Sequence, residues 1–532
     1  MKRFTCEPKT QNPFTLRARR SLGEGWRSCE TQRLEGFCCI KILLKNFLVL
    51  FLINLLATSN IFSTPINNRY DPNAFHTVFG SDKFYTKKNS WLSLSLSPFY
   101  QHASGAKNKD GIKVPEGDIF GRWNMPALFY GFTYNAAGYQ PNENPSPSTK
   151  QFVLQQIAAP HNIPNAATRG DGVPGLYPRL SEAWRVLDDY NDGQNPVADH
   201  LAVGYDYTNE TLFDSSNNND GFFSVPIDYE KYGLRGKLNV EFGHGIGLQF
   251  KSGVVEYKQK PTFDDKTPVP AGATNLDNAR TQIRKYLMAP AKRDAIAKEL
   301  GLNIDEQKEV ALEDTHIQLY FNHSFDLKDE NDEHVVSMIP YLAFGVWAPS
   351  GEEKDQNKAF SLPTGNDGYV GVTIEGSINL DFPQMVQLGF GGGAAFFGSK
   401  NYSNYRVPNS VYQSGIYPWH AKIKRSVGTV WYVNASFMAK DFIDKLSFFF
   451  DYIHTQHEQD SIIMKEATND RNNLFKPKKL EEESKWKGDF VHAGLNYQIT
   501  PGLEVGLSVN AHVTGVRVYR TTTILGSITF NY

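Results

Sequence analysis

Cysteine is nearly absent from this chain of 532 residues and is confined to its beginning. The four cysteines, Cys6, Cys29, Cys38 and Cys39, all precede the main apolar run, and none follows it. A fold held together by disulfides is therefore excluded for everything after residue 39. The distribution favours a chain that crosses an oxidising compartment unfolded, where stray thiols would form wrong disulfides.

An excess of charge and long apolar runs are lacking too. The chain carries 55 basic and 57 acidic side chains, for a net charge of -2. No basic excess is available to neutralise phosphates, which excludes a nucleic acid as partner. The mean hydropathy of -0.44 is too polar for a bundle of membrane helices, because each spanning helix needs about 20 apolar residues.

One short apolar run does occur, near the amino end. It extends from Phe47 to Ala57, with lysines before it and small polar residues after it. The run is shorter than the roughly 17 to 25 residues of a spanning helix, so we predict a cleaved signal peptide over residues 40–63. Cleavage after Ser59 or after Ser63 fits the pattern of small residues.

The segments around this signal divide the chain. Residues 1–39 form an N-terminal extension longer than a usual signal start. We hypothesise that they are not translated and that translation begins downstream, for instance at Ile40. Residues 64–90 are expected to be a periplasmic N-terminal segment, followed by a single domain over 91–532.

Alternation of apolar and polar residues dominates the chain after residue 90. The clearest example has apolar Leu503, Val505, Leu507, Val509, Ala511 and Val513 separated by Glu504, Gly506, Ser508, Asn510 and His512. A period of two is typical of a strand with one apolar face and one polar face. The pattern predicts twelve strands, at 91–102, 232–242, 246–258, 314–326, 335–348, 369–381, 385–397, 428–440, 445–457, 488–500, 503–517 and 521–532.

The connections between these strands alternate in length. Links such as 243–245, 381–384 and 500–502 are tight turns, whereas 103–231 and 259–313 are long. Transmembrane barrels have short periplasmic turns and long external loops. Predicted strands of 11 residues or more also suit a tilted membrane strand, which needs about 9 to 11. The fold class we predict is all-β, an antiparallel transmembrane β-barrel of about twelve strands.

The carboxyl end completes this pattern. Ile528, Phe530 and Tyr532 alternate with polar residues and end on an aromatic side chain. Together with the export signal, this end resembles the outer-membrane β-barrel proteins of Gram-negative bacteria, which are porin-like, at the level of the class. The resemblance implies an outer-membrane location, contact with outer-membrane lipid, and recognition of these three residues by the barrel-assembly machinery.

The polar face of the predicted strands supplies the candidate site. If the apolar face meets lipid, the other face lines the lumen. The candidate lumen residues are Arg235, Lys237, Glu241, Lys251, His316, Glu375, Asp451, His492, Glu504 and His512. Such mixed charges fit a water-filled lumen with weak ion selectivity. They also fit a lumen packed shut by salt bridges and hydrogen bonds, because twelve strands lie between filled and open barrels.

One loop contains a different pattern. Residues 275–301 space Leu276, Ala279, Ile283 and Leu287 as on a helix, and Pro290 ends that stripe before another begins. We predict a helical insert in the second external loop. It could fold into the mouth as a constriction or lie outside on other loops.

No local motif for catalysis is present. The chain has no G-x-S-x-G, H-E-x-x-H or P-loop sequence, so we expect no catalytic residue, metal or cofactor. A porin-like channel for passive transport of small polar solutes or ions is the expected function. The alternative is a surface-exposed adhesin or binding protein on a plugged barrel, for which loop 103–231 provides ample surface. An outer-membrane hydrolase is a third hypothesis.

Overall fold

The computed structural model describes residues 69–71, 91–123, 223–265, 290–299, 301–328, 334–383, 385–408, 415, 417, 419–465 and 475–532. The predicted extension 1–39 and signal 40–63 lie outside these residues, as does most of loop 103–231.

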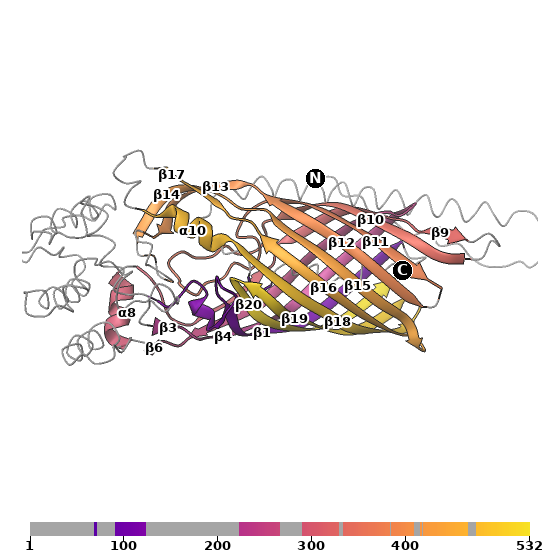
Figure 1. Cartoon of the computed structure of the whole chain (residues 1–532), viewed down its shortest axis with the longest axis horizontal. Coiled ribbons are helices and arrows are strands. Elements are labelled where there is room, and N and C mark those ends of the chain that lie inside the picture. Colours follow the sequence, from indigo (N-terminus) through magenta and orange to yellow (C-terminus); the bar gives the residue numbers. More distant parts are fainter. Residues whose placement is uncertain are drawn as a thin grey trace, which may run out of the picture. The chain divides into compact units, whose positions relative to one another are not determined.

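Twelve antiparallel strands close into a barrel, so the predicted fold is confirmed (Figure 1). Each strand pairs with the next in chain order, and the last pairs with the first. The strands are β1 (Leu92–Lys107), β4 (Ile227–Gly243), β5 (Ile246–Pro261), β8 (Thr315–Asn322), β10 (His334–Ala348), β11 (Gly371–Phe382), β12 (Val386–Phe397), β15 (Val430–Ile443), β16 (Leu446–His457), β18 (Trp486–Thr500), β19 (Leu503–Val516) and β20 (Val518–Asn531).

The fourth strand of the barrel continues beyond both ends of β8. It is preceded by β7 (Gln307–Leu312), which also pairs with β5, and followed by β9 (Phe325–Lys328), which pairs with β10. The register on β5 shifts by one residue between β7 and β8. Such a bulge changes which residues face inward, and here the consecutive side chains of Glu313 and Asp314 are both buried.

The barrel closes where its two ends meet. β1 and β20 pair along almost their whole length, with Leu94 opposite Phe530. The backbone N–H of Tyr532 donates to the carbonyl of Leu92 at 2.9 Å. Gly526 is a gap in the apolar face of β20, and a Cβ there would make ordinary contact with the ring of Pro98 on β1, at 3.4 Å.

The two ends of the barrel differ as the loop lengths predict. Tight turns join β4 to β5, β11 to β12, β15 to β16 and β18 to β19 at one end. At Gly245 in the first turn, φ is +79° and a Cβ would lie 2.1 Å from the carbonyl oxygen of Asn322, so only glycine fits. Small elements gather at the other end: β2 (Lys113–Val114), η2 (Glu116–Asp118), β3 (Phe223–Ser224), β6 (Asp264–Asp265), α8 (Pro290–Glu299), β13 (Ser399–Val407), β14 (Trp419–Ser426), β17 (Ser461–Met464) and α10 (Pro477–Ser484) (Figure 1).

Part of the predicted helical insert falls within the described residues. α8 covers its second half, and the guanidinium of Arg293 lies 3.9 Å from the centre of the Phe263 ring. The first half lies outside the described residues. No helix in the described part of the chain is long and apolar enough to cross a membrane.

The outer surface of the barrel is apolar. Every one of the twelve strands exposes at least one large apolar or aromatic side chain. In a water-soluble β-protein such a face would pack against a second layer. One example from each strand is Tyr100, Leu234, Val254, Leu319, Phe344, Val372, Phe390, Val433, Phe450, Leu495, Leu507 and Ile524.

Removing the last three residues should prevent closure. Deletion of Phe530–Tyr532 takes away the end of the β1–β20 ladder, including the Tyr532 to Leu92 hydrogen bond. We expect most of the protein to fail to reach the compact form that migrates faster on a gel before heating than after it. The matched variant Phe530→Leu keeps the backbone ladder and should assemble. Normal heat-modifiable migration of the deleted chain would refute this closure requirement.

Candidate functional site

The inner face of the barrel is polar, and the candidate lumen residues lie on it. Side chains of Arg235, Lys237, Lys251, His316, Asp451 and His492 are buried, while those of Glu241, Glu375, Glu504 and His512 are partly buried. All ten lie on the face of their strand opposite its apolar residues, as the period of two predicts. Ile528, Phe530 and Tyr532, by contrast, lie on β20 or directly after it, at the barrel seam.

Two lysines lie next to each other on one wall of the lumen. Lys237 on β4 pairs in register with Lys251 on β5, which pairs with His316 on β8. Asp451 lies on β16, which is six strands from β5 in either direction around the barrel. It accepts a hydrogen bond from Asn434 at 2.9 Å. The lumen thus has acidic and basic side chains on different strands.

A buried cluster of two cations and two carboxylates lies on the same wall. Arg235, fully buried, donates from Nε and Nη2 to the two carboxylate oxygens of Glu313 at 2.6 and 2.7 Å. Lys231 Nζ lies 2.8 Å from the same carboxylate. The bulge between β7 and β8 aims Glu313 inward, and Gly253 leaves room for it, because a Cβ there would lie 2.6 Å from its Oε2. The Arg235 guanidinium lies 4.1 Å from the centre of the Phe99 ring.

The second carboxylate of the cluster comes from a segment outside the barrel wall. Asp71 Oδ2 lies 2.5 Å from Arg235 Nη2 and 3.8 Å from Lys231 Nζ. Tyr70 stacks between the rings of Tyr229 and Tyr519, with centroid distances of 3.9 and 3.6 Å.

Three residues of the predicted periplasmic segment 64–90 are described, Arg69–Asp71, and all three are buried on the inner side of the barrel. The carbonyl of Tyr70 accepts from Gln101 Nε2 at 3.3 Å, and that of Arg69 accepts from the Tyr519 backbone at 3.4 Å. The other residues of the segment lie outside the described residues, so its periplasmic location stays a prediction.

Several other inner polar groups have no hydrogen-bond partner among the residues that the structure describes. Both polar side-chain atoms of Gln318, of Gln387 and of His512 are buried without a hydrogen bond to any described residue. A buried polar group left without a partner costs about 1–3 kcal/mol. Stable burial of these amides and this imidazole therefore requires water or a polar solute inside the barrel.

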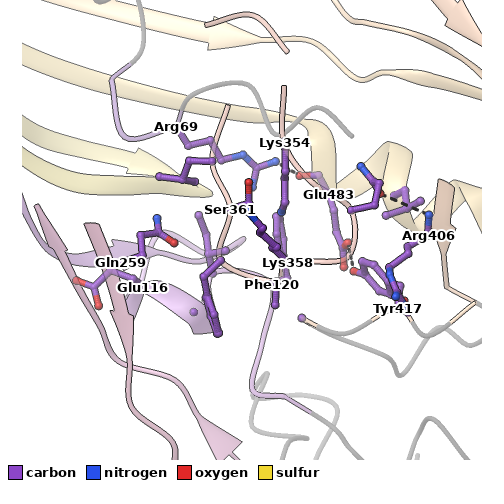
Figure 2. Close-up of a pocket in the computed structure, with 18 of the residues that line it drawn as sticks. Arg69, Glu116, Phe120, Gln259, Lys354, Lys358, Ser361, Arg406, Tyr417 and Glu483 are labelled. Atoms are coloured by element: carbon purple, nitrogen blue, oxygen red, sulfur yellow. Dashed lines mark hydrogen bonds between the residues drawn. The ribbon is translucent and has the colours of Figure 1, made fainter. Parts of the chain in front are cut away.

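A cavity of about 150 Å³ lies where the loops meet the barrel (Figure 2). Three residues from different parts of the chain border it: Arg69 from the buried segment Arg69–Asp71 (the lumen segment), Lys354 from the β10–β11 loop and Glu483 from α10. Its apolar lining includes Phe120, and the stacked rings of Trp123 and Phe360 with centroids 5.4 Å apart. The sequence did not predict this cavity, because its lining comes from many separate segments.

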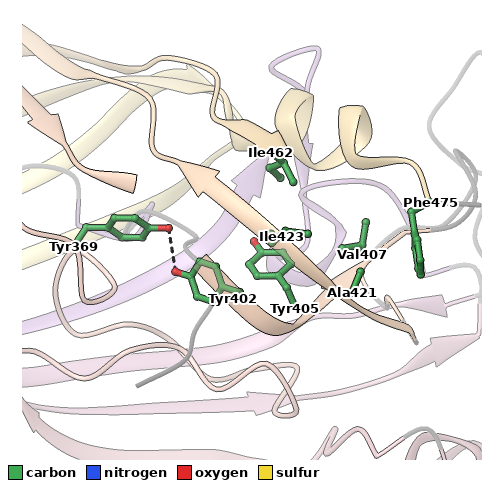
Figure 3. Packing of buried hydrophobic residues seen from close by; sticks show 8 residues of the cluster. All are labelled: Tyr369, Tyr402, Tyr405, Val407, Ala421, Ile423, Ile462 and Phe475. Carbon is green, nitrogen blue, oxygen red and sulfur yellow. Dashed lines mark hydrogen bonds between the residues drawn. The ribbon is translucent and has the colours of Figure 1, made fainter. Parts of the chain in front are cut away.

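A three-stranded sheet of β13, β14 and β17 stands beside this cavity at the loop end of the barrel. The prediction treated both contributing segments as loops. The sheet has its own hydrophobic core, in which the hydroxyl of Tyr402 donates to that of Tyr369 at 3.0 Å (Figure 3). A buried ion pair joins Arg425 on β14 to Asp460, the residue before β17. The core consists of Tyr369, Tyr402, Tyr405, Val407, Ala421, Ile423, Ile462 and Phe475.

Hydrogen bonds connect the beginning and the end of the first long loop. Asp118 in η2 accepts hydrogen bonds from Ser224 Oγ at 2.5 Å and from the Val225 backbone N–H at 2.8 Å. Burial raises the pKa of Asp118 to about 6, although these hydrogen bonds oppose the shift. Its carboxyl group therefore titrates in the range where bacterial surroundings vary.

Within the described residues, no group of three His, Cys, Asp or Glu side chains could hold a metal ion. His454 and His457 are close in sequence, but their side chains contact different groups. His454 Nδ1 lies 2.6 Å from Asp489, whereas His457 Nδ1 lies 2.8 Å from the carbonyl of Ser484.

Comparison with known proteins gives only distant structural similarity. No protein-family model matches the chain, and no curated protein matches it. An outer-membrane channel from Pseudomonas putida F1 is 7% identical, with a TM-score of 0.39 over 84% of this chain and 98% of that one. The translocator domain of the autotransporter NalP from Neisseria meningitidis is 5% identical, with a TM-score of 0.32 over 88% and 100%. The NanC porin is 8% identical, with a TM-score of 0.26 over 57% and 94%. The barrel assignment rests on the strand pairing rather than on these similarities.

Neutralising Glu313 should destabilise the barrel. In Glu313→Gln, Arg235 and Lys231 retain only Asp71 as a charged partner, and breaking a buried ion pair costs about 3–5 kcal/mol. We expect a lower urea midpoint for unfolding of the refolded protein. Glu306→Gln is the matched control, because Glu306 is exposed and lies 3.6 Å from Lys258. Equal midpoints for the two variants would contradict the role of the cluster.

Burial of Asp118 should become more favourable as the pH falls, because burial penalises the charged form of its carboxyl group. The pKa of Asp118 rises from about 3.9 in the unfolded chain to about 6 in the folded one. Its contribution to stability is thus fully present below pH 4 and is lost as the pH rises through about 6. Hydrogen exchange at the Val225 amide, after correction for its intrinsic pH dependence, should show this loss. Asp118→Asn should remove the pH dependence, and a dependence unchanged in that variant would rule out Asp118 as its source.

Proposed function

We propose that this protein is a channel of the bacterial outer membrane that lets small polar solutes or ions diffuse through its lumen. The observation that carries the proposal is the closed barrel itself, apolar outside and charged inside. We further propose that Arg69–Asp71 restrict passage in the conformation described.

The outer surface supports a membrane location. Most barrel strands have 12 to 17 residues, and a tilted strand needs about 9 to 11 to span a bilayer. Closure satisfies the backbone hydrogen bonds of every strand, as a bilayer requires. The exposed apolar side chains on all twelve strands then face lipid instead of water.

The lumen supports passage of polar solutes. The unpartnered groups of Gln318, Gln387 and His512 need water, and a hydrated lumen is a path for small polar molecules. Lys237 and Lys251 pair in register on one wall, and Glu241 lies on the same face of β4. Such mixed charges favour weak ion selectivity.

The lumen segment supports restricted passage. Asp71 forms an ion pair with Arg235 inside the barrel, and Tyr70 is clamped between two rings. Cleavage of the predicted signal after Ser59 or Ser63 would leave this segment close to the new amino terminus. Release of Arg69–Asp71 would break the Asp71 ion pair and the stacking of Tyr70 but none of the strand pairings of the wall.

A binding protein on a plugged barrel is the second candidate. It is favoured by the β13–β14–β17 sheet, which has its own core and adds a folded surface at the loop end. Conduction separates the two functions, because a permanently plugged barrel carries no current.

The experiment is current measurement on the refolded protein in a planar bilayer. Discrete ohmic steps are expected. Asp71→Asn should open more often than the unaltered protein, because the amide cannot replace the ion pair while Glu313 still neutralises Arg235. Asp228→Asn removes the same charge from an exposed position on β4 and should behave like the unaltered protein. Silence of all three in correctly folded form would contradict the channel and favour the binding protein.

A further inference from the structure

The cavity at the loop end contains more positive charge than its protein partners neutralise. Arg425 pairs with Asp460, and Lys358 lies 2.7 Å from Glu309. These two cations of the lining thus have their own carboxylates. Two others differ, Arg69 and Lys354.

Arg69 is 2% exposed, and its hydrogen bonds leave two donor atoms unused. Nη2 donates to the backbone carbonyl of Glu483, which is neutral. Nε and Nη1 are buried without a partner in the described part of the chain. The guanidinium is held in place, since it lies 4.7 Å from the centre of the Phe120 ring. A buried cation with unused donors is unfavourable unless an anion completes the site.

Lys354 borders the same cavity and forms no ion pair with any described residue. Hydrogen bonds from backbone to side chains hold the loop that contains Lys354. The N–H of Lys354 donates to Asp367 at 2.9 Å, and that of Asp355 donates to Ser361 Oγ at 3.1 Å. Burial lowers the pKa of Lys354 to about 8. Asp367 and Asp355 oppose this shift without cancelling it, so the protein compensates only in part for the loss of water around the ammonium, and a bound anion would complete the compensation.

The nearby carboxylates do not serve as that anion. Glu483 has its own cation, with Lys479 Nζ at 3.0 Å, and it accepts from the Tyr417 hydroxyl. Glu116 accepts a hydrogen bond from the Ile227 backbone N–H at 3.3 Å, and burial raises the pKa of its carboxyl group. Two further donors of the lining, the side-chain nitrogens of Gln259 and Gln356, have no partner either. The unused groups are therefore mostly donors, as an oxyanion requires.

The rest of the lining indicates what the anion is attached to. Phe120, Trp123 and Phe360 provide aromatic surface in the same cavity as the cations. The volume of about 150 Å³ is about that of a cavity known to accept benzene. Pockets for organic ligands combine such an apolar lining with a few placed polar groups.

We propose that this cavity binds a small organic anion, with Arg69 and Lys354 holding its oxyanion group and the aromatic side chains contacting its apolar body. Binding in this cavity does not require conduction through the lumen, so the anion site and the channel function are tested independently.

Calorimetric titration of the refolded full-length protein tests the site with three probes. Benzoate should bind at one site per chain. Benzamide has the same shape without the charge and should bind about tenfold more weakly or worse, since charged hydrogen bonds are worth about twice neutral ones. Inorganic phosphate has the charge without the ring and should also bind more weakly than benzoate. Equal affinity of benzoate and either control probe would overturn the proposal, as would no binding of benzoate.

Substitutions locate the binding. Lys354→Met and Arg69→Gln should each weaken benzoate binding about tenfold or more. Lys308→Met removes the same charge from an exposed residue at the same end of the barrel and should leave the affinity unchanged. Heat-modifiable migration shows whether each variant folds. If Lys354→Met does not fold, the Arg69→Gln protein decides the test, because Arg69 lies outside the barrel wall. Unchanged affinity in a folded Arg69→Gln protein would overturn the assignment.

Discussion

A guanidinium in the middle of a barrel requires opposite charge within reach, and the structure around Arg235 follows from that requirement. The wall supplies Glu313 through a bulge that turns two consecutive acidic side chains inward. The amino-terminal segment supplies Asp71. Lys231 brings the cluster to two cations and two carboxylates. Because this balance includes a residue outside the wall, the lumen and the amino-terminal segment depend on each other.

The same segment connects the lumen to the loop end. Asp71 lies at the cluster, Tyr70 is stacked between Tyr229 and Tyr519, and Arg69 borders the cavity. An anion bound at Arg69 would therefore contact the segment whose position restricts the lumen. A ligand shifts such an equilibrium only if it binds one position of the segment better than the other. The unused donors of Arg69 provide a physical basis for that difference.

The barrel could be predicted from the sequence because its cause is local. Alternation along β19, for example, follows directly from one lipid face and one polar face. Arg235 could be assigned inward for the same reason, but its partners could not. Glu313 depends on a one-residue bulge, and Asp71 lies in a segment without periodicity. The β13–β14–β17 sheet was missed because its core joins residues from two loops, including Tyr402 and Ile462.

The central claim is that a lumen segment restricts a hydrated barrel, and a reversible cross-link tests it directly. Tyr70→Cys and Gln101→Cys place two thiols at positions in contact, in a chain without other cysteines after Cys39. With the pair cross-linked, the account predicts that the segment stays in the lumen and the bilayer current is lost. Reduction should restore the current. Currents that are equal in the cross-linked and reduced protein would contradict the account.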